Sequence, residues 1–252
     1  MKLNNSDVDF GEFPNGEYNL PTENLEVLEN NTVIWHFGNN NDIIKLALLS
    51  SHIKDMGGKS ELYITYLPYS RMDRPNGHYS ISIRCIADLI NNMGFTRVTI
   101  REPHSSVSLD LIERSEPHWW CAERIDRVMN KCGAESVFYP DKGACDRYEV
   151  HNTFKYATGK KNRNFADGKI ESMSIDGFVA DKVLIIDDLC SRGGTFINAA
   201  KLLRDRGAKN IYLLVAHCEN NIFTGDIFNY IDMVFTSTEM LDKDHPRITK
   251  IK

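Results

Sequence analysis

Segments rich in strand-forming residues alternate with segments of helical periodicity along nearly the whole chain. The first pair is typical: β-branched and aromatic residues fill positions 33–37, and apolar residues recur at helical spacing from 42 to 56. Parallel strands need a crossover connection that is usually a helix, so this alternation predicts an α/β fold with mostly parallel sheets. We expect strands at 33–37, 62–67, 98–101, 136–139, 170–175, 183–186, 211–216, 233–236 and 248–251, and helices at 42–56, 80–93 (capped by Ser80), 195–206 and directly after Asp141.

The same pattern occurs twice, which predicts two similar halves. We place the boundary at residue 130, so that the halves are 1–130 and 131–252, each a mostly parallel sheet flanked by helices on both faces. Ligands of such sheets bind at the carboxyl ends of the strands. The polar loops that should carry the site therefore follow Leu67, Arg101, Tyr139 and Ile186. The basic, glycine-bearing stretch 156–168 is expected to be irregular and mobile.

Composition excludes several classes of protein. Hydrophobic residues make up 42% and charged residues 26% of the chain, which is ordinary for a globular protein. The formal net charge of −5 has the wrong sign for a general nucleic-acid binder. Apolar runs are far shorter than the ~20 residues of a membrane helix, and the polar start predicts no secretory signal. The six cysteines form no C-x-x-C pair, so we expect reduced thiols in a cytoplasmic protein with no membrane or nucleic-acid partner.

The strongest motif is VLIIDDLCSRGGT at residues 183–195, in which an apolar strand ends in two carboxylates and a glycine loop opens a helix. Glycines let the backbone approach a ligand, and N–H groups at a helix start attract anions. Asp187 and Asp188 can accept bonds from sugar hydroxyls or hold Mg²⁺. The alternative is a plain strand–turn–helix junction capped by Thr195. The residues expected to bind a phosphorylated sugar are Asp187, Asp188, Ser191, Arg192, Gly193, Gly194 and Thr195.

This motif resembles the 5-phosphoribosyl-1-diphosphate (PRPP) motif of type I phosphoribosyltransferases and of ribose-phosphate diphosphokinases. Three further segments resemble only the diphosphokinases: FPNGE at 13–17 (their F-x-D-G-E), YLPYSRMDR at 66–74 (their P-Y-x-x-Y-x-R-Q-D-R) and TRVTIREPH at 96–104 (their strand ending in D-L-H). Their order and spacing agree over roughly residues 10–240. The chain is thus similar to ribose-phosphate diphosphokinases (PRPP synthetases), as a short and divergent member with two phosphoribosyltransferase-like halves.

The resemblance implies an activity in nucleotide biosynthesis. A diphosphokinase of this family moves the β,γ-diphosphate of ATP to the anomeric hydroxyl of ribose 5-phosphate and gives PRPP and AMP, with Mg²⁺ as cofactor. The half 1–130 would then serve ATP binding and oligomerisation, and the half 131–252 would carry the PRPP loop and a flexible catalytic loop. In the family, the N-terminal hairpin that matches residues 13–17 reaches the site of a neighbouring subunit. The resemblance therefore implies a homo-oligomer, at least a dimer.

Particular residues inherit roles from the family's motifs. The resemblance assigns ATP binding to Phe13, Asn15, Glu17, Arg71, Met72, Asp73, Arg74 and His104. It assigns metal binding to His104, Asp141 (in the P-D-x-G match PDKG) and Asp187. It assigns catalysis to Lys161, Arg163 and His104, with the first two matching the family's K-x-R. Taken without the resemblance, the Arg-Asp-Arg loop, His104 and the Lys-Arg stretch are also compatible with a salt-bridge cluster, a structural histidine and a solvated basic loop.

Departures from the family pattern leave the acceptor open. Ser191 and Arg192 stand where diphosphokinases commonly have Asp and Thr (or Gln and Ser), Asn15 replaces an aspartate, and Met72 replaces a glutamine. An extra arginine beside the phosphate cradle suits either ribose 5-phosphate or ADP-ribose, whose product would feed NAD⁺ synthesis. Two other readings remain, a non-catalytic regulatory homologue and a phosphoribosyltransferase.

Overall fold

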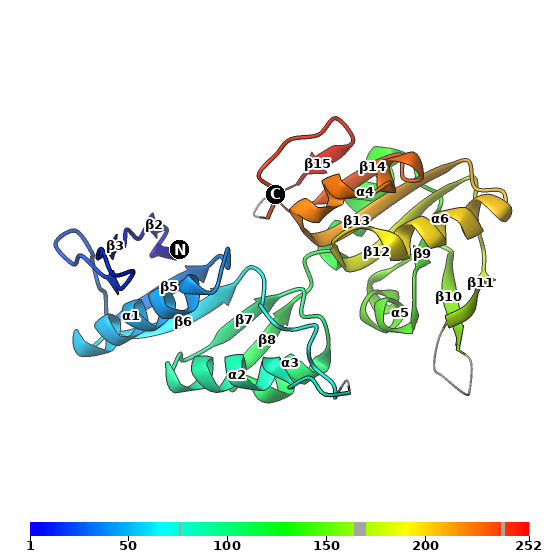
Figure 1. Ribbon diagram of the computed structural model, residues 1–252. Helices are drawn as coiled ribbons and strands as arrows, with labels where there is room; N and C mark the ends of the chain where they lie inside the picture. Colours follow the sequence, from blue (N-terminus) through cyan, green and yellow to red (C-terminus); the bar gives the residue numbers. More distant parts are fainter. Residues whose placement is uncertain (76, 164–169, 238–239, 252) are drawn as a thin grey trace. The chain divides into compact units, whose positions relative to one another are not determined.

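The computed structural model describes residues 1–75, 77–163, 170–237 and 240–251, without the side chains of 161–163 and 170–173. The chain divides into two compact units, Met1–His118 and Trp119–Lys252 (Figure 1). This division falls before the predicted boundary at residue 130. The reason is that helix α4 (Ile125–Cys132) buries Ile125 and Val128 in a core that belongs to the second unit.

The first unit contains a six-stranded sheet with the order β2-β1-β5-β6-β7-β8. The strands from β5 to β8 are parallel, whereas β1 pairs antiparallel with both β2 and β5. A separate hairpin is formed by β3 (Gly11–Glu12) and β4 (Tyr18–Asn19). The other elements of this unit are β1 (Lys2–Leu3), β2 (Ser6–Asp7), β5 (Asn30–Trp35), α1 (Asn41–Asp55), β6 (Lys59–Ile64), α2 (Ser82–Asn92), β7 (Val98–Arg101), α3 (Ser106–Leu111) and β8 (Ser115–His118).

The core of the first unit lies on one face of its sheet. Alternate strand residues such as Val33, Trp35 and Leu62 are buried in one cluster with side chains from α1 and α2. The intervening positions are more polar, for example Tyr63 and Thr99, and remain partly exposed. Within this unit, the described helices therefore cover the apolar face of the sheet. The prediction of helices on both faces does not hold for this unit, because the second face of its sheet is polar.

The second unit contains a seven-stranded sheet with the order β11-β10-β9-β12-β13-β14-β15. Neighbouring strands are parallel except for the antiparallel edge pair β10 and β11. The strands are β9 (Ser136–Tyr139), β10 (Tyr156–Arg163), β11 (Ile170–Gly177), β12 (Lys182–Cys190), β13 (Asn210–Cys218), β14 (Met233–Thr236) and β15 (Ile248–Lys250). The helices are α4, α5 (Lys142–Tyr148) and α6 (Gly194–Asp205), with short 3₁₀ turns at Ala122–Arg124, Glu149–His151, Asn220–Thr224 and Ile227–Asn229.

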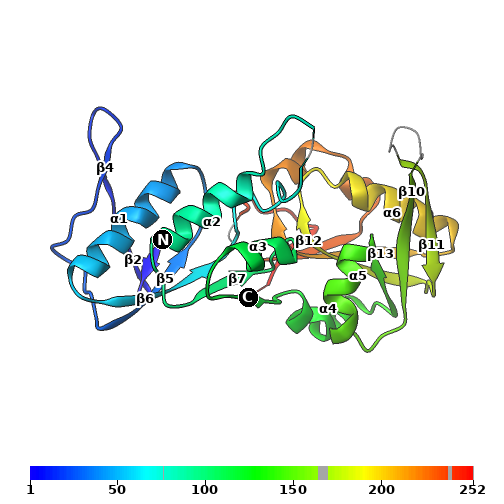
Figure 2. The same cartoon turned by 90° about the horizontal axis from the view of Figure 1, so that it is seen from below.

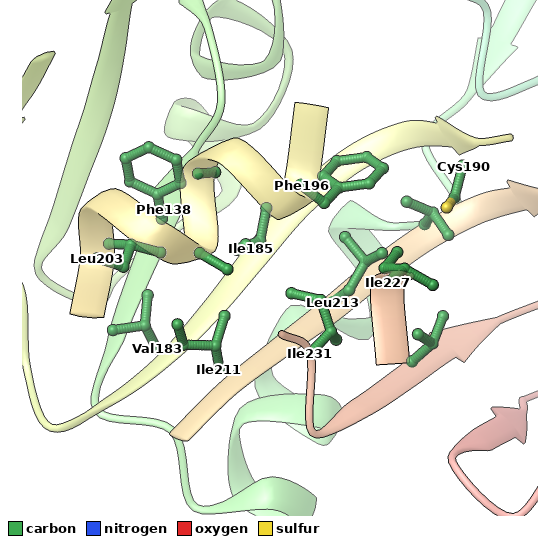
Figure 3. Packing of buried hydrophobic residues seen from close by; sticks show 14 of the residues in the cluster. Phe138, Val183, Ile185, Cys190, Phe196, Leu203, Ile211, Leu213, Ile227 and Ile231 are labelled. Carbon is green, nitrogen blue, oxygen red and sulfur yellow. The ribbon is translucent and has the colours of Figure 1, made fainter. Parts of the chain in front are cut away.

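Helices cover both faces of this second sheet, as predicted. Strand residues such as Phe138 and Ile185 pack with α6, and their neighbours Val137 and Leu184 pack with α4 and α5 on the opposite face. Figure 3 shows the first of these layers, with Phe196 of α6 in the apolar cluster above the strands. The two-residue alternation of side chains across each strand produces the three layers.

Two local predictions are wrong. Helix α2 begins at Ser82 with Ile81 at its cap and no side-chain cap, so Ser80 does not cap it. Residues 156–163 form strand β10, which pairs with β9 through residues 156–158 and with β11 through residues 157–163, with a shift of register between Asn162 and Arg163. The rest of the expected loop, 164–168, lies outside the described residues. No helix among the described residues has the length and apolarity required to cross a membrane.

Candidate functional site

The glycine loop between β12 and α6 is held in one backbone conformation by the residues that pack against it. Gly193 has φ +80°, and a Cβ there would lie 2.5 Å from Cδ1 of Ile227. Only glycine adopts this left-handed conformation at such close approach without strain. Ile227 and Phe196 are both seen in the cluster of Figure 3, so the loop rests directly on the core.

The start of α6 is open to a ligand. Gly193 occupies the N-cap position and no side chain caps the helix, so the alternative in which Thr195 caps it is wrong. Gly194 and Thr195 are exposed, as is Arg192, and nothing lies within 4 Å of a Cβ built at Gly194. The first N–H groups of a helix have no partner within the helix and carry partial positive charge. This loop therefore has the geometry of an anion site.

Two carboxylates stand beside this loop and share one cation. Asp187 and Asp188 follow four buried apolar residues of β12, and their side chains are 14% and 7% exposed. Nη2 of Arg147, from α5, donates to Oδ1 of Asp187 at 2.8 Å and to Oδ1 of Asp188 at 3.2 Å. The Arg147 side chain is itself only 13% exposed. The three groups thus form a largely buried triad.

Electrostatics make this triad costly for folding. Burial raises the pKa of the Asp187 carboxyl well above its usual range, the charge of Asp188 raises it further, and Arg147 opposes both effects. Two adjacent carboxylates in a poorly solvated site repel each other and lose hydration. Such an arrangement is typical of ligand-binding sites, where perturbed groups concentrate.

Asp141 lies at the same edge of the second sheet. It follows β9, the parallel neighbour of β12, and caps α5 by accepting a hydrogen bond from the Ala144 N–H at 3.1 Å. Its charge also raises the pKa of Asp187. Carboxylate oxygens are the donors that Mg²⁺ prefers, so Asp141 and Asp187 fit this ion chemically. Within the described part of the chain, no group of three or more His, Cys, Asp or Glu side chains is arranged to hold a metal.

A cavity of about 780 Å³ opens next to Asp141, between α5 and the stem of the β10–β11 hairpin. Lys160 lines it and pairs with Asp176 across the hairpin at 2.6 Å. Lys161 and Arg163 follow Lys160 on β10, where their backbones pair with Met173 and Ile170. Their side chains lie outside the described residues, so their catalytic role remains a prediction.

In the first unit, the loops after β6 and β7 meet. Asp73 Oδ2 accepts a hydrogen bond from the Ser105 hydroxyl at 2.6 Å, which ties the Arg-Asp-Arg segment to the residue after His104. Arg71 and Arg74 are exposed, whereas Met72, Asp73 and His104 are partly buried. Nε of Arg74 lies 3.7 Å from Oδ1 of Asp73, so this part of the alternative, a salt-bridge cluster in the Arg-Asp-Arg loop, is present. The Arg74 side chain is nevertheless 80% exposed.

Phe13, Asn15 and Glu17 lie at the exposed tip of the β3–β4 hairpin, which stands out from its unit in Figure 2. Gly16 has φ +87° in the turn, and the Asn15 side chain accepts from the Glu17 N–H at 3.2 Å. Phe13 is 50% exposed, an unusual position for a large aromatic residue.

Arg147 also belongs to this site, although no sequence motif predicted it. The sequence feature that indicates it is its position six residues after Asp141, on a helix that starts beside β12. Loops that follow neighbouring parallel strands meet at one edge of a sheet. A cation in the helix after β9 was therefore a candidate partner for the aspartates after β12.

Comparison with solved structures defines the class of fold. The chain superposes on phosphoribosylpyrophosphate synthetase from Mycobacterium smegmatis with a TM-score of 0.79 and 20% identity, covering 97% of this chain and 85% of that one. This likeness confirms the α/β fold with two halves. No protein-family model matches the sequence.

Sequence relatives define the family. The ribose-phosphate pyrophosphokinase of Thermococcus kodakarensis is 30% identical over 223 residues, which cover 84% of this chain and 77% of that protein. Those of Pyrococcus abyssi and Saccharolobus solfataricus are 31% and 28% identical over 70% and 69% of this chain. The chain belongs to the ribose-phosphate pyrophosphokinase family, whose members are also called ribose-phosphate diphosphokinases. The matched region spans 64% and 63% of the last two relatives.

Proposed function

We propose that the protein is a diphosphokinase that transfers the diphosphate of ATP to the anomeric hydroxyl of a ribose 5-phosphate acceptor, giving PRPP and AMP. The observation that carries this proposal is the uncapped start of α6 beside Asp187 and Asp188 in a chain of this family. An anion cradle adjoining two hydrogen-bond acceptors suits a phosphate and the hydroxyls of one pentose.

The second unit would bind the acceptor. The N–H groups at Gly194 and Thr195, with the Ser191 and Thr195 hydroxyls, would hold the 5-phosphate. Asp187 and Asp188 would accept hydrogen bonds from the ribose hydroxyls and so orient the anomeric hydroxyl. Orientation of the attacking group is a large part of catalysis in phosphoryl and diphosphoryl transfer.

The first unit would bind ATP. Arg71 and Arg74 supply permanent charges for the phosphates, and the Ser105–Asp73 bond fixes their segment next to His104. Phe13, Asn15 and Glu17 would contact the adenine, and Met72 would take part in the same segment. The exposure of Phe13 supports a site shared with a neighbouring subunit, hence a dimer at least.

In the second unit, Asp141 and Asp187 would hold Mg²⁺ through their carboxylate oxygens, the donors that this ion prefers. In the first unit, the family resemblance assigns a metal-binding role to the ring nitrogen of His104. When bound, the ion neutralises charge on the polyphosphate. Lys161 and Arg163 would stabilise the charge that develops on the transferred diphosphate. These roles are part of the proposal.

ADP-ribose is the second candidate acceptor. Arg192 is exposed next to the cradle, where a guanidinium can pair with the second phosphate of a diphosphate ester. The test is incubation of the purified protein with Mg-ATP and either acceptor, followed by detection of AMP and of the diphosphorylated product by mass spectrometry. Product from ribose 5-phosphate alone supports PRPP synthesis, and preferred turnover of ADP-ribose supports the second acceptor. If neither acceptor yields AMP, the diphosphokinase proposal is wrong, and a regulatory homologue or a phosphoribosyltransferase takes its place.

A further inference from the structure

Arg147 and the two aspartates form a contact that strand geometry alone does not produce. Consecutive side chains of an extended strand point to opposite faces of the sheet. Asp187 and Asp188 nevertheless both reach one nitrogen atom, Nη2 of Arg147, at 2.8 and 3.2 Å. The backbone N–H of Asp188 also donates to Oδ1 of Asp187 at 2.9 Å. These contacts, and not the strand backbone alone, therefore bring the two carboxylates together.

These contacts hold each carboxylate at one of its two oxygens. Both of the bonds from Arg147 end on Oδ1 atoms. A side chain held at one oxygen has lost most of its rotational freedom before a ligand arrives. Preorganised acceptors bind a ligand more tightly because less entropy is lost on association.

The support of Arg147 is itself rigid. Its helix, α5, is capped by Asp141, and the next residue, Tyr148, is fully buried in the core of the second unit. The Arg147 guanidinium also lies 5.6 Å from the centre of the Tyr148 ring. A planar, fixed donor of this kind orients carboxylates better than a flexible ammonium group.

We infer that Arg147 is a positioning residue for the acceptor: it holds Asp187 and Asp188 in the one arrangement in which both accept hydrogen bonds from neighbouring sugar hydroxyls. This inference rests on the proposed function. It adds that acceptor affinity depends on a residue that does not itself touch the acceptor.

The test compares Arg147→Met with Arg124→Met. Arg124 is a matched control in the same unit, 17% exposed, bonded to Glu123 and to the Trp120 carbonyl. For Arg147→Met we expect the acceptor KM and the calorimetric acceptor Kd to rise about 10- to 100-fold, the usual effect of a lost charge-assisted bond. We expect the fall in kcat to be smaller than the rise in acceptor KM, and Arg124→Met to match the wild type in acceptor KM, acceptor Kd, kcat and the KM for ATP.

A second variant covers the case in which Arg147→Met does not fold. Arg147→Lys keeps the charge but loses the planar fork, and we expect its acceptor KM to rise less than that of Arg147→Met. Guanidinium ion at millimolar concentration should restore part of the acceptor affinity of Arg147→Ala and should leave the acceptor affinity of Arg124→Ala unchanged.

Outcomes separate this inference from the proposed function. If the wild type neither binds an acceptor nor releases AMP, the proposed function and the inference both fall. If the wild type is active but the Arg147 variants bind acceptor as tightly as the Arg124 control, only the inference is overturned. A fall in kcat at constant acceptor KM overturns it too, because Arg147 would then act on the chemical step.

Discussion

Asp187 is a residue at which ligand binding and folding make opposite demands. Its sequence context, directly after four apolar strand residues, was enough to predict a ligand site. Its pairing with Arg147 was not predictable, because that contact depends on how α5 packs against the sheet and has no local signature. The raised pKa of Asp187, caused first by burial, indicates that its charge opposes folding at neutral pH.

We predict that Asp187→Asn abolishes AMP release but stabilises the fold at neutral pH. A carboxyl whose pKa is raised in the folded state contributes most stability below its unfolded pKa and loses it as the pH rises through the folded pKa. The variant should therefore melt at a higher temperature than the wild type at pH 7–8. The gain should vanish towards acid pH, where the wild-type carboxyl is protonated. An equal difference at every pH in thermal melts would contradict this account.

Asp141 combines a structural and a proposed metal role that two substitutions separate. Asparagine can still cap α5, so Asp141→Asn should leave the free energy of unfolding within about 0.5 kcal/mol of the wild type while AMP release falls. Asp141→Ala should lose the cap as well, at a cost of about 1 kcal/mol. Urea unfolding and the AMP assay measure the two effects, and normal turnover of Asp141→Asn would remove Asp141 from the site.

At the scale of elements, the local sequence pattern predicted most strands and helices. It failed where pairing with a neighbouring strand determines the secondary structure. Strands β7, β9 and β14 have the predicted bounds, because runs of apolar and β-branched residues specify buried strands. Strand β10 was missed, since its polar, glycine-bearing sequence resembles a loop and only its pairing with β9 and β11 makes it a strand.

The junction between β12 and α6 offers a matched pair of substitutions. Gly193→Ala introduces a Cβ 2.5 Å from Ile227 at φ +80°, whereas Gly194→Ala meets nothing within 4 Å. We expect Gly193→Ala to lower the free energy of unfolding by about 1–3 kcal/mol and to weaken acceptor binding, because the loop must shift. Gly194→Ala should stay within about 0.5 kcal/mol of the wild type. Urea unfolding of both variants decides, and equal losses would show that the loop conformation is not constrained as described.

At the scale of the whole molecule, the two units carry complementary sets of predicted residues. The ATP set lies entirely in Met1–His118, and the acceptor set lies entirely in Trp119–Lys252. The sequence predicted two halves because the alternation of strands and helices occurs twice. It did not predict where they divide, since α4 joins the second core through contacts that the sequence pattern does not show.

The exposed hairpin tip gives the last prediction, which concerns two copies of the chain. Phe13 is 50% exposed in its own chain, so Phe13→Ala should melt like the wild type yet release little AMP if the tip completes a neighbour's ATP site. Mixing this variant with inactive Asp187→Asn should then restore activity. Half of the randomly formed dimers would be mixed, and one of their two sites would combine an intact tip with an intact Asp187, giving about a quarter of wild-type activity. The control is each variant alone at the same total concentration. If activity does not return after subunit exchange has been verified by mass spectrometry, the hairpin acts within its own chain or not at all.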